Sequence, residues 1–210
     1  MIQSDIFDSV NMYIKKITNI ALIFAIKKLI EIFGIIISCI GILLLVSLIT
    51  YSPDDPNFIF PDNTQIENLL GFQGSYVSDL FFQSIGIISY LISITFIFTG
   101  INIFRSKEIF LIIENIFYTV LYSIIGSLFF AFFYQNAFTL YINGNGGFVG
   151  NYFNQTFLKT FMLLNENISF FILITLIVSL FSFSINFKFK NFYNFLKKII
   201  NLFNQTEKNY

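Results

Sequence analysis

The stretch Leu29–Thr50 reads LIEIFGIIISCIGILLLVSLIT and contains a single charged residue, Glu31. At a rise of about 1.5 Å per residue, a helix of this length crosses the roughly 30 Å hydrocarbon core of a bilayer. Lipid offers no hydrogen-bonding partners to backbone groups, so such a run is expected to be helical. Three further apolar runs of similar length follow, at Leu80–Phe104, Ile109–Phe133 and Ile168–Ile185. The sequence therefore predicts an all-α, polytopic membrane protein with four transmembrane helices.

Composition and charge agree with this fold class. Hydrophobic residues make up 56% of the chain and charged residues 11%, whereas soluble domains carry about 25% charged residues. The basic residues flank the runs on one side: Lys15, Lys16, Lys27, Lys28, Arg105, Lys107, Lys188, Lys190, Lys197 and Lys198. The other two connections, 51–79 and 134–167, carry one lysine and six carboxylates: Lys159 with Asp54, Asp55, Asp62, Glu67, Asp79 and Glu166. The positive-inside rule then predicts that both termini are cytoplasmic and that the loops 51–79 and 134–167 are outside.

The segments around the runs predict shorter helices. Residues 1–28 have apolar positions at helical spacing and are expected to form a separate amphipathic segment on the cytoplasmic leaflet; these positions are Ile6, Val10, Tyr13 or Ile14, Ile17 and Ala21. Residues 188–210 form a basic amphipathic tail or the start of a linker. Tyr152–Leu164 is too short to span and suits an interfacial or re-entrant helix. Ser75 or Ser78 is expected to cap the second long helix, with Asp79 in its first turn.

The chain offers little material for catalysis. It contains no histidine and one cysteine, Cys39, which is expected to pack as a small apolar residue in the first helix. These counts exclude an intrachain disulfide, the usual zinc sites and every histidine-based triad. The glycine-rich stretch Gly144–Gly150 lacks the GK[ST] ending of a phosphate-binding loop and indicates a backbone turn. We therefore predict no catalytic, metal-binding or cofactor-binding residues.

Two carboxylates lie within the apolar runs, where charges are costly and often functional. Glu31 is in the first turn of its helix and is expected to pair with Lys27. Glu114 lies deeper and has three open roles: lining a pathway, binding a partner helix, or hydrogen bonding within the bundle, with Asn102 as a candidate partner. Five glycines are expected to mark close helix contacts; they are Gly34, Gly41, Gly86, Gly100 and Gly126. The residues alone thus favour anchoring, oligomerisation or recognition, with a small transporter or channel subunit that uses Glu114 as the alternative.

Three loop motifs resemble those of a known protein family. The first is YSPDDP at Tyr51–Pro56, the second GFQGSYVSD at Gly71–Asp79, and the third GGFVG at Gly146–Gly150. In this order, and with these four helices, they resemble the N-terminal membrane domain of the FtsK family of bacterial DNA translocases. The matching positions are Tyr51, Ser52, Pro53, Asp55, Pro56, Gly71, Gly74, Asp79, Gly146, Gly147 and Gly150. The resemblance implies that these motifs are recognition or shape-setting loops, and Asp55 and Asp79 are expected to aid septal recruitment.

The resemblance also implies a place in the cell. The family's membrane domain lies in the bacterial inner (cytoplasmic) membrane at the division septum, forms a homo-oligomer (a hexamer by resemblance) and contacts other division proteins. It links the septum to chromosome segregation through an ATPase motor that carries Walker A and B motifs. Neither motif is found in these 210 residues. The chain is therefore not expected to be an enzyme, to bind a cofactor or to contact nucleic acid directly.

Overall fold

The computed structural model describes residues 2–56, 65–135, 143–187 and 197, and the regular structure in these residues is helical. Four helical stretches among them are long and apolar enough to cross a membrane; they are Lys15–Ile49, Gly71–Ser106, Leu111–Phe133 and Glu166–Ser184. The prediction of an all-α protein with four membrane-spanning helices is confirmed, and the chain is a multi-pass membrane protein.

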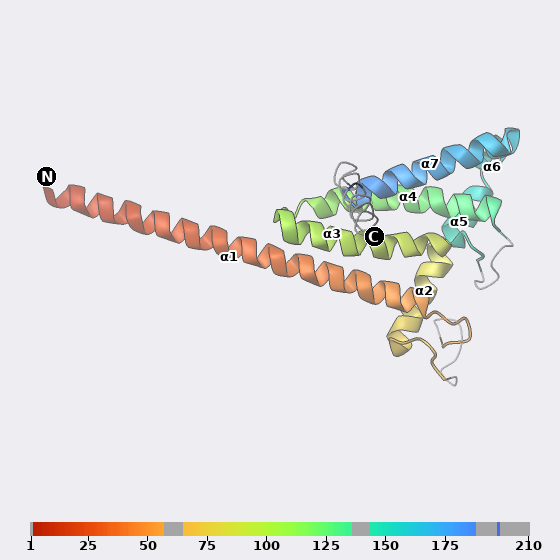
Figure 1. Ribbon diagram of the computed structural model, residues 1–210, viewed down its shortest axis with the longest axis horizontal. Helices are drawn as coiled ribbons and strands as arrows, with labels where there is room; N and C mark the ends of the chain where they lie inside the picture. The colour runs from red at the N-terminus through yellow and green to blue at the C-terminus, as the bar shows by residue number, and fades with distance from the viewer. Residues whose placement is uncertain (1, 57–64, 136–142, 188–196, 198–210) are drawn as a thin grey trace, which may run out of the picture.

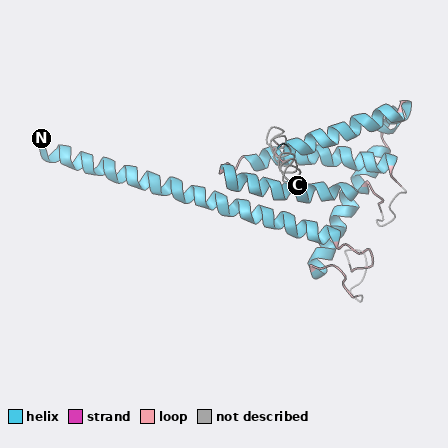
Figure 2. Cartoon of the chain, viewed as in Figure 1, coloured by secondary structure: helices cyan, strands magenta, loops and turns pink. Residues whose placement is uncertain are grey.

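Four long helices form the bundle (Figures 1 and 2). They are α1 (Ile2–Ile49), α3 (Ser89–Ser106), α4 (Leu111–Phe133) and α7 (Glu166–Ser184). α1 packs along α3, α3 contacts α4, and α7 packs along α4. The buried apolar core between them consists of Leu44, Leu48, Phe82, Ile88, Ile92, Tyr122, Phe129 and Ile177.

The first helix is longer than the sequence predicted. α1 continues without interruption from Ile2 to Ile49 over 48 residues, so residues 1–28 do not form a separate amphipathic helix. Neither glycine nor proline occurs between Ile2 and Phe33, and those are the residues that usually end or kink a helix. The first half of α1 consequently projects well past the turn between α3 and α4 (Figure 1).

The second apolar run is broken rather than continuous. α2 (Gly71–Ile85) is followed by a short 3-10 helix, η1 (Gly86–Ile88), and then by α3. Gly86 has φ 69°, a conformation that glycine adopts without steric cost, and α2 meets α3 at a steep angle there (Figure 1). The predicted single helix Leu80–Phe104 is therefore wrong.

The predicted caps of this run are also wrong. Because α2 begins at Gly71, Ser75, Ser78 and Asp79 all lie inside the helix, and all three are buried there.

Two short helices occupy the second long connection. α5 (Gly147–Asn154) and α6 (Phe157–Leu164) replace the single helix expected at Tyr152–Leu164. Thr156 separates them, because its hydroxyl accepts the backbone N–H of Leu158 at 3.3 Å and caps α6. The tail 188–210 lies outside the described residues except for residue 197.

Gly34, Gly41, Gly100 and Gly126 are confirmed as close-packing points between helices, whereas Gly86 packs against the backbone of Asn145 in the second long connection. A Cβ atom on Gly34 would lie 2.7 Å from the carbonyl oxygen of Gly100, and one on Gly41 would lie 2.7 Å from the backbone nitrogen of Ile97. Between them, the Ser38 hydroxyl donates to the carbonyl oxygen of Ile97 at 3.0 Å. α1 and α3 are thus in backbone contact through small residues, a common arrangement for helices in lipid. Cys39 is exposed on α1 rather than packed, which corrects the expectation for it.

Candidate functional site

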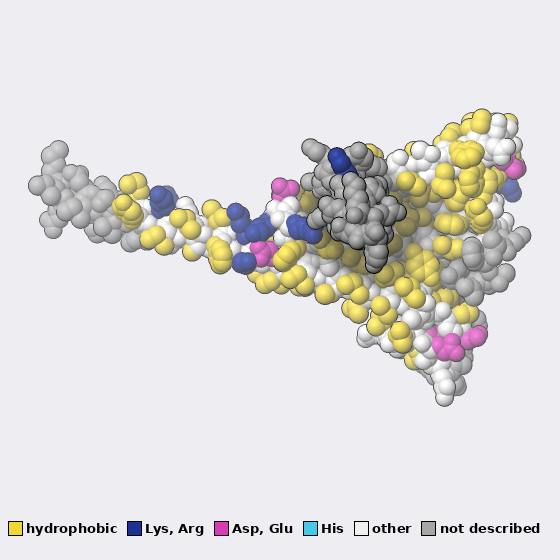
Figure 3. Space-filling view, in the orientation of Figure 1, with side chains coloured by type: hydrophobic (Ala, Val, Ile, Leu, Met, Phe, Trp, Pro, Cys, Tyr) yellow, Lys and Arg dark blue, Asp and Glu magenta, His cyan; other side chains and the backbone are white. Residues whose placement is uncertain are grey.

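The family-motif residues gather at one end of the bundle, which we call the motif end; it comprises residues 50–56, 65–86 and 143–166. The opposite end carries the α3–α4 turn at 107–110 and is called the basic end. On the face shown in Figure 3, Lys and Arg side chains gather along α1 and at the α3–α4 turn, whereas the α2 corner at the motif end carries acidic side chains. The two ends therefore differ in charge as well as in structure.

At the motif end, Asp55 closes the first loop. Its side chain is buried, and its carboxylate accepts the backbone N–H groups of Glu67 at 2.7 Å and Asn68 at 3.0 Å. The Asn68 side chain in turn donates to the carbonyl oxygens of Ser47 at 2.9 Å and Thr50 at 3.2 Å, at the end of α1. Hydrogen bonds to an ionised carboxylate are the stronger kind, so Asp55 ties both sides of this loop together.

Two serine hydroxyls then hold α2 against this loop. Ser75 donates to the carbonyl oxygen of Pro56 at 2.9 Å, and Ser47 of α1 donates to that of Gly74 at 2.6 Å. A Cβ atom on Gly74 would lie 2.6 Å from the side chain of Leu70. The first and second motifs therefore form one packed unit.

Asp79 connects this unit to the glycine-rich motif. One carboxylate oxygen of Asp79 accepts the Tyr51 hydroxyl at 3.1 Å and the Gln83 amide at 3.4 Å. The Gln83 side-chain oxygen accepts the backbone N–H of Asn143, and the Gln83 carbonyl accepts the Asn143 amide, both at 3.2 Å. A chain of polar contacts thus runs from the first loop, through α2, to the segment that carries the third motif.

The third motif packs directly on the bend in the second helix. The Ile87 N–H donates to the carbonyl oxygen of Asn145 at 3.0 Å, and a Cβ atom on Gly86 would overlap that same oxygen. A Cβ atom on Gly147, where φ is 63°, would lie 2.6 Å from the backbone nitrogen of Gly86. Gly146 and Gly150 have no room for a side chain beside Ser127 of α4. Glycine is required here because three backbones meet.

The structure thus brings the motif residues together, and most of them are buried. Asp55 is 1% exposed and Asp79 4% exposed, which favours shape-setting over direct recognition for both carboxylates. Gly71 is different: its φ is 65° and no atom lies within 4 Å of a Cβ placed there. The contributions of Asn68, Gln83, Asn143 and Asn145 were not anticipated from the sequence.

A polar pocket lies beside this junction, between the end of α4 and the helices α5 and α6. Its lining consists of Gln135, Asn151, Asn154, Gln155, Thr156, Lys159 and Thr160. These side chains supply amides, hydroxyls and one amine, without a nucleophile paired to a base. Within the described ranges, no three His, Cys, Asp or Glu residues gather closely enough to hold a metal ion.

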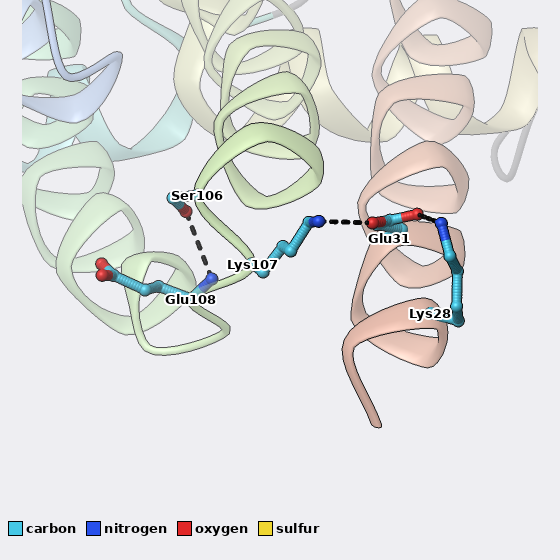
Figure 4. A network of polar contacts seen from close by, with 5 residues as sticks. All are labelled: Lys28, Glu31, Ser106, Lys107 and Glu108. Atoms are coloured by element: carbon cyan, nitrogen blue, oxygen red, sulfur yellow. Dashed lines mark hydrogen bonds and ion pairs between the residues drawn. The ribbon is translucent and has the colours of Figure 1, made fainter. Parts of the chain in front are cut away.

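The basic end is tied together by an ion-pair network (Figure 4). The Glu31 carboxylate lies 2.7 Å from the Lys28 amine and 2.9 Å from the Lys107 amine. The predicted partner Lys27 is therefore wrong, and the pairing joins α1 to the turn after α3. Lys107 is brought into reach because it ends α3 in a left-handed conformation, with φ 62°.

We expect Glu31→Gln and Lys107→Met to lower the thermal midpoint of the detergent-solubilised chain non-additively, because each removes one side of the same ion pair. The coupling, measured in a double-mutant cycle, should shrink as salt rises. Glu108→Gln, in the same turn, is the control and should leave the midpoint nearly unchanged. Fully additive effects of the two changes would contradict an energetic link between α1 and the turn.

Glu114 is exposed on the surface of α4, whereas its neighbour Asn115 is 1% exposed. The Asn115 amide donates to the Thr99 hydroxyl at 2.8 Å, and its side-chain oxygen accepts the Asn186 amide at 2.9 Å. Asn102 donates to the carbonyl oxygen of Ile185 at 3.0 Å, so the expected Glu114–Asn102 pair is wrong. The interior polar position of this helix is Asn115, which sequence reasoning missed.

A second polar contact lies deeper in the bundle. The Thr95 hydroxyl is 2.9 Å from the Tyr122 hydroxyl and 3.0 Å from the Ser184 hydroxyl. These three residues belong to α3, α4 and α7. Because few side chains of α7 are buried, such interhelical hydrogen bonds are well placed to fix it on the bundle.

Comparison with known proteins gives the family. The chain matches the family described as the 4TM region of DNA translocase FtsK/SpoIIIE over residues 27–197, which is more than half of its length. It is similar to the DNA translocase FtsK of Rickettsia bellii (strain RML369-C), with 32% identity over 74 residues, or 35% of this chain and 10% of that protein. It is also similar to the DNA translocase FtsK of Rickettsia prowazekii (strain Madrid E), with 32% identity over 69 residues, or 33% and 9% of the two chains.

The matched part of the chain thus spans about a tenth of the length of these curated relatives. No solved structure matches the chain. The match over residues 27–197 and the four spanning helices place the chain in one family: it belongs to the 4TM region of the DNA translocases FtsK and SpoIIIE.

Proposed function

We propose that the chain is the membrane-anchoring and oligomerising domain of an FtsK-type DNA translocase, and that it links the division septum of a bacterial inner membrane to chromosome segregation. The observation that carries this proposal is the buried junction at the motif end. There the family motifs are joined by Asp55, Asp79 and the fit of Asn145 on Gly86. Such a junction gives the loops one fixed shape, as a docking surface requires.

The charge difference between the ends supports an orientation with both termini in the cytoplasm. Lys28, Arg105 and Lys107 lie at the basic end, whereas Asp54, Glu67 and Glu166 lie at the motif end. Short loops rich in lysine and arginine are retained on the cytoplasmic side. The motif end would then face outward and contact division proteins, while α7 returns the chain to the cytoplasm.

In this proposal, ATP hydrolysis and DNA translocation belong to a motor outside these residues, and the chain makes no direct contact with nucleic acid. Copies of the domain would associate in the membrane, as a hexamer by family resemblance, and so set the number of motors held at one place.

The position of Glu114 does not support the alternative function of a transporter or channel subunit. Its carboxylate is on the bundle surface rather than among the interior polar contacts of α3, α4 and α7. A pathway through this bundle would instead be lined by interior groups. We therefore propose no second function.

The test is the location of the chain in dividing cells. With a fluorescent protein at its C-terminus, the chain should form a band at constricting septa and fractionate with membranes. The same fluorescent protein on an unrelated single-helix anchor should label the envelope evenly. An even distribution of the chain itself, with normal membrane insertion, would contradict septal recruitment by this domain.

A further inference from the structure

The polar pocket beside α5 and α6 lies at the level where two membrane-spanning helices reach the motif end (Figure 1). α4 ends at Phe133, two residues before Gln135 of the pocket lining, and α7 begins at Glu166, two residues after α6 ends. The two helices have 23 and 19 residues, or lengths of about 35 Å and about 28 Å. These lengths match a hydrocarbon core of about 30 Å. The pocket therefore lies at the depth of the lipid headgroups at this end of the bundle.

The lining of the pocket offers hydrogen-bond donors and one positive charge. Its described residues supply four amides, two hydroxyls and the amine of Lys159, with no carboxylate among them. The pocket volume is about 590 Å³, and sites for small ligands typically have volumes of about 300–1,000 Å³. Lys159 is exposed and forms no ion pair with another residue of the described chain. A ligand with a negative charge and several acceptor oxygens would match this chemistry.

Three of the lining side chains are held by the backbone, and the others are open to a ligand. Asn151, Asn154 and Thr156 each donate to a backbone carbonyl oxygen, at 2.6 Å, 3.4 Å and 2.6 Å. The remaining four are exposed and make no side-chain hydrogen bond to any residue that the structure describes; they are Gln135, Gln155, Lys159 and Thr160. The pocket thus combines a fixed wall with free donors.

α6 presents an apolar face beside this pocket. Phe157, Phe161 and Leu164 are spaced by four and three residues, which places them on one side of the helix, and they are 70%, 65% and 77% exposed. Met162, on another side, is buried against the bundle. A helix at headgroup depth with exposed aromatic residues on one side and Lys159 on another is typical of a helix in the membrane interface. This pattern favours lipid as the molecule that covers the apolar face.

We propose that this pocket binds the phosphate group of an anionic phospholipid. The Lys159 amine pairs with the phosphate, and the Gln155 amide and the Thr160 hydroxyl donate to its oxygens. The acyl chains of the same lipid lie along the side of α6 that carries Phe157 and Phe161. This inference assigns a ligand to the motif end and goes beyond the anchoring and recruitment proposed above. In the proposed orientation, the lipid belongs to the outer leaflet.

The charges at this end favour an anionic headgroup over a zwitterionic one. Lys159 is the single lysine of the two loops 51–79 and 134–167, which contain no arginine. The described lining has no carboxylate that could pair with the ammonium group of a zwitterionic lipid. A soluble phosphate would offer the same oxygens to Lys159, but it has no acyl chains to cover the adjacent apolar face of α6. The two features together favour a lipid.

Quenching of a single tryptophan by brominated lipids tests the proposal. The chain contains no tryptophan, so Phe161→Trp supplies one reporter on α6. The full chain is reconstituted in phosphatidylcholine vesicles in which brominated acyl chains are carried either by phosphatidylglycerol or, at the same mole fraction, by phosphatidylcholine. One lysine attracts an anionic lipid with a preference of about fivefold, so we expect the quenching to show about fivefold enrichment of phosphatidylglycerol at the reporter. Equal quenching by the two lipids would overturn the proposal.

Three variants in the reporter background separate the pocket from general surface charge. Lys159→Gln should abolish the preference for phosphatidylglycerol, whereas Lys15→Gln, which removes an exposed lysine of α1, should leave it unchanged. Gln155→Leu keeps the charge but removes an uncharged donor, and should lower the preference at least about twofold. A preference that Gln155→Leu leaves unchanged would show that surface charge alone attracts the lipid, and would reject the pocket.

Two further measurements fix the source of the phosphate and the scope of the result. Inorganic phosphate, compared with chloride at equal ionic strength, should not change the preference; a loss of the preference would assign the pocket to a soluble phosphate instead. The lipid preference is read in vesicles and the septal band in cells. Equal quenching together with a normal septal band would therefore reject this inference and leave the proposed function standing.

Discussion

Replacing Gly86 with alanine is expected to destabilise the motif end strongly. Gly86 has φ 69°, and a Cβ atom there would overlap the carbonyl oxygen of Asn145. Its ψ is −149°, and this combination of positive φ and extended ψ is essentially restricted to glycine and costs another residue roughly 1–3 kcal/mol. Overpacking costs about 1–3 kcal/mol more. The neighbours that would have to move are backbone atoms, which cannot change rotamer. We therefore expect the free energy of unfolding to fall by about 3 kcal/mol or more.

Gly71→Ala is the comparison variant for the packing contact. Gly71 has nearly the same φ, 65°, but no atom lies within 4 Å of a methyl group added there, so it carries the conformational cost alone, roughly 1–2 kcal/mol. Gly147→Ala should resemble Gly86→Ala, since its Cβ atom would lie 2.6 Å from the Gly86 nitrogen. The measurement is the thermal midpoint of the detergent-solubilised chain, followed by fluorescence-detected size-exclusion chromatography. Equal midpoints for Gly71→Ala and Gly86→Ala would show that the packing of Asn145 on Gly86 contributes nothing.

The break at Gly86 also shows where sequence reasoning stops. The spans were predictable because each needs about 20 apolar residues, and hydropathy reports that directly. The residues on both sides of Gly86 are equally apolar, so hydropathy predicts one continuous helix. The bend depends on Asn145, which is 59 positions further along the chain. A contact at that separation leaves no local signal.

The polar contacts were predictable only in part. Asp55 and Asp79 stood out as carboxylates in motif loops, but Gln83 and Asn143 look like ordinary solvent-facing amides until the fold brings them together. On α4, the sequence does contain a pattern that identifies Asn115, and not Glu114, as the interior polar residue. Residues of like character at four-residue intervals share a helical face, and Asn115 is followed at that spacing by Thr119, Ser123 and Ser127.

The prediction of a separate N-terminal helix is wrong for a different reason. Lys27 and Lys28 suggest a boundary, because paired lysines usually sit at the end of a span. A lysine pair does not break a helix, however, since lysine is a good helix former. The charge pattern therefore predicts a boundary at the lysine pair, whereas the backbone of α1 continues through it as one helix.

Removing the Asp55 carboxylate is expected to unfold the first loop and, with it, the junction of the motifs. Asp55 is 1% exposed and accepts two backbone N–H groups, from Glu67 and Asn68. Asp55→Ala leaves both donors without this partner, and each unsatisfied buried group costs about 1–3 kcal/mol. We expect a loss of about 2–4 kcal/mol in the free energy of unfolding, and a smaller loss for Asp55→Asn, which keeps one acceptor oxygen. Glu67→Ala, an exposed side chain of the same loop, should stay within about 0.5 kcal/mol of wild type.

The combination of stability and location decides what Asp55 does. A shape-setting carboxylate predicts that the thermal midpoint and the septal band are lost together, and that Asp55→Asn reduces both in proportion. A recognition carboxylate predicts that Asp55→Ala keeps the wild-type midpoint and loses only the band. Burial allows the first outcome and opposes the second, because a partner protein cannot reach a side chain that is covered by its own loop. Loss of recruitment alone would therefore overturn the assignment, and loss of stability alone would show that the septal partner reads a surface that survives when this loop opens.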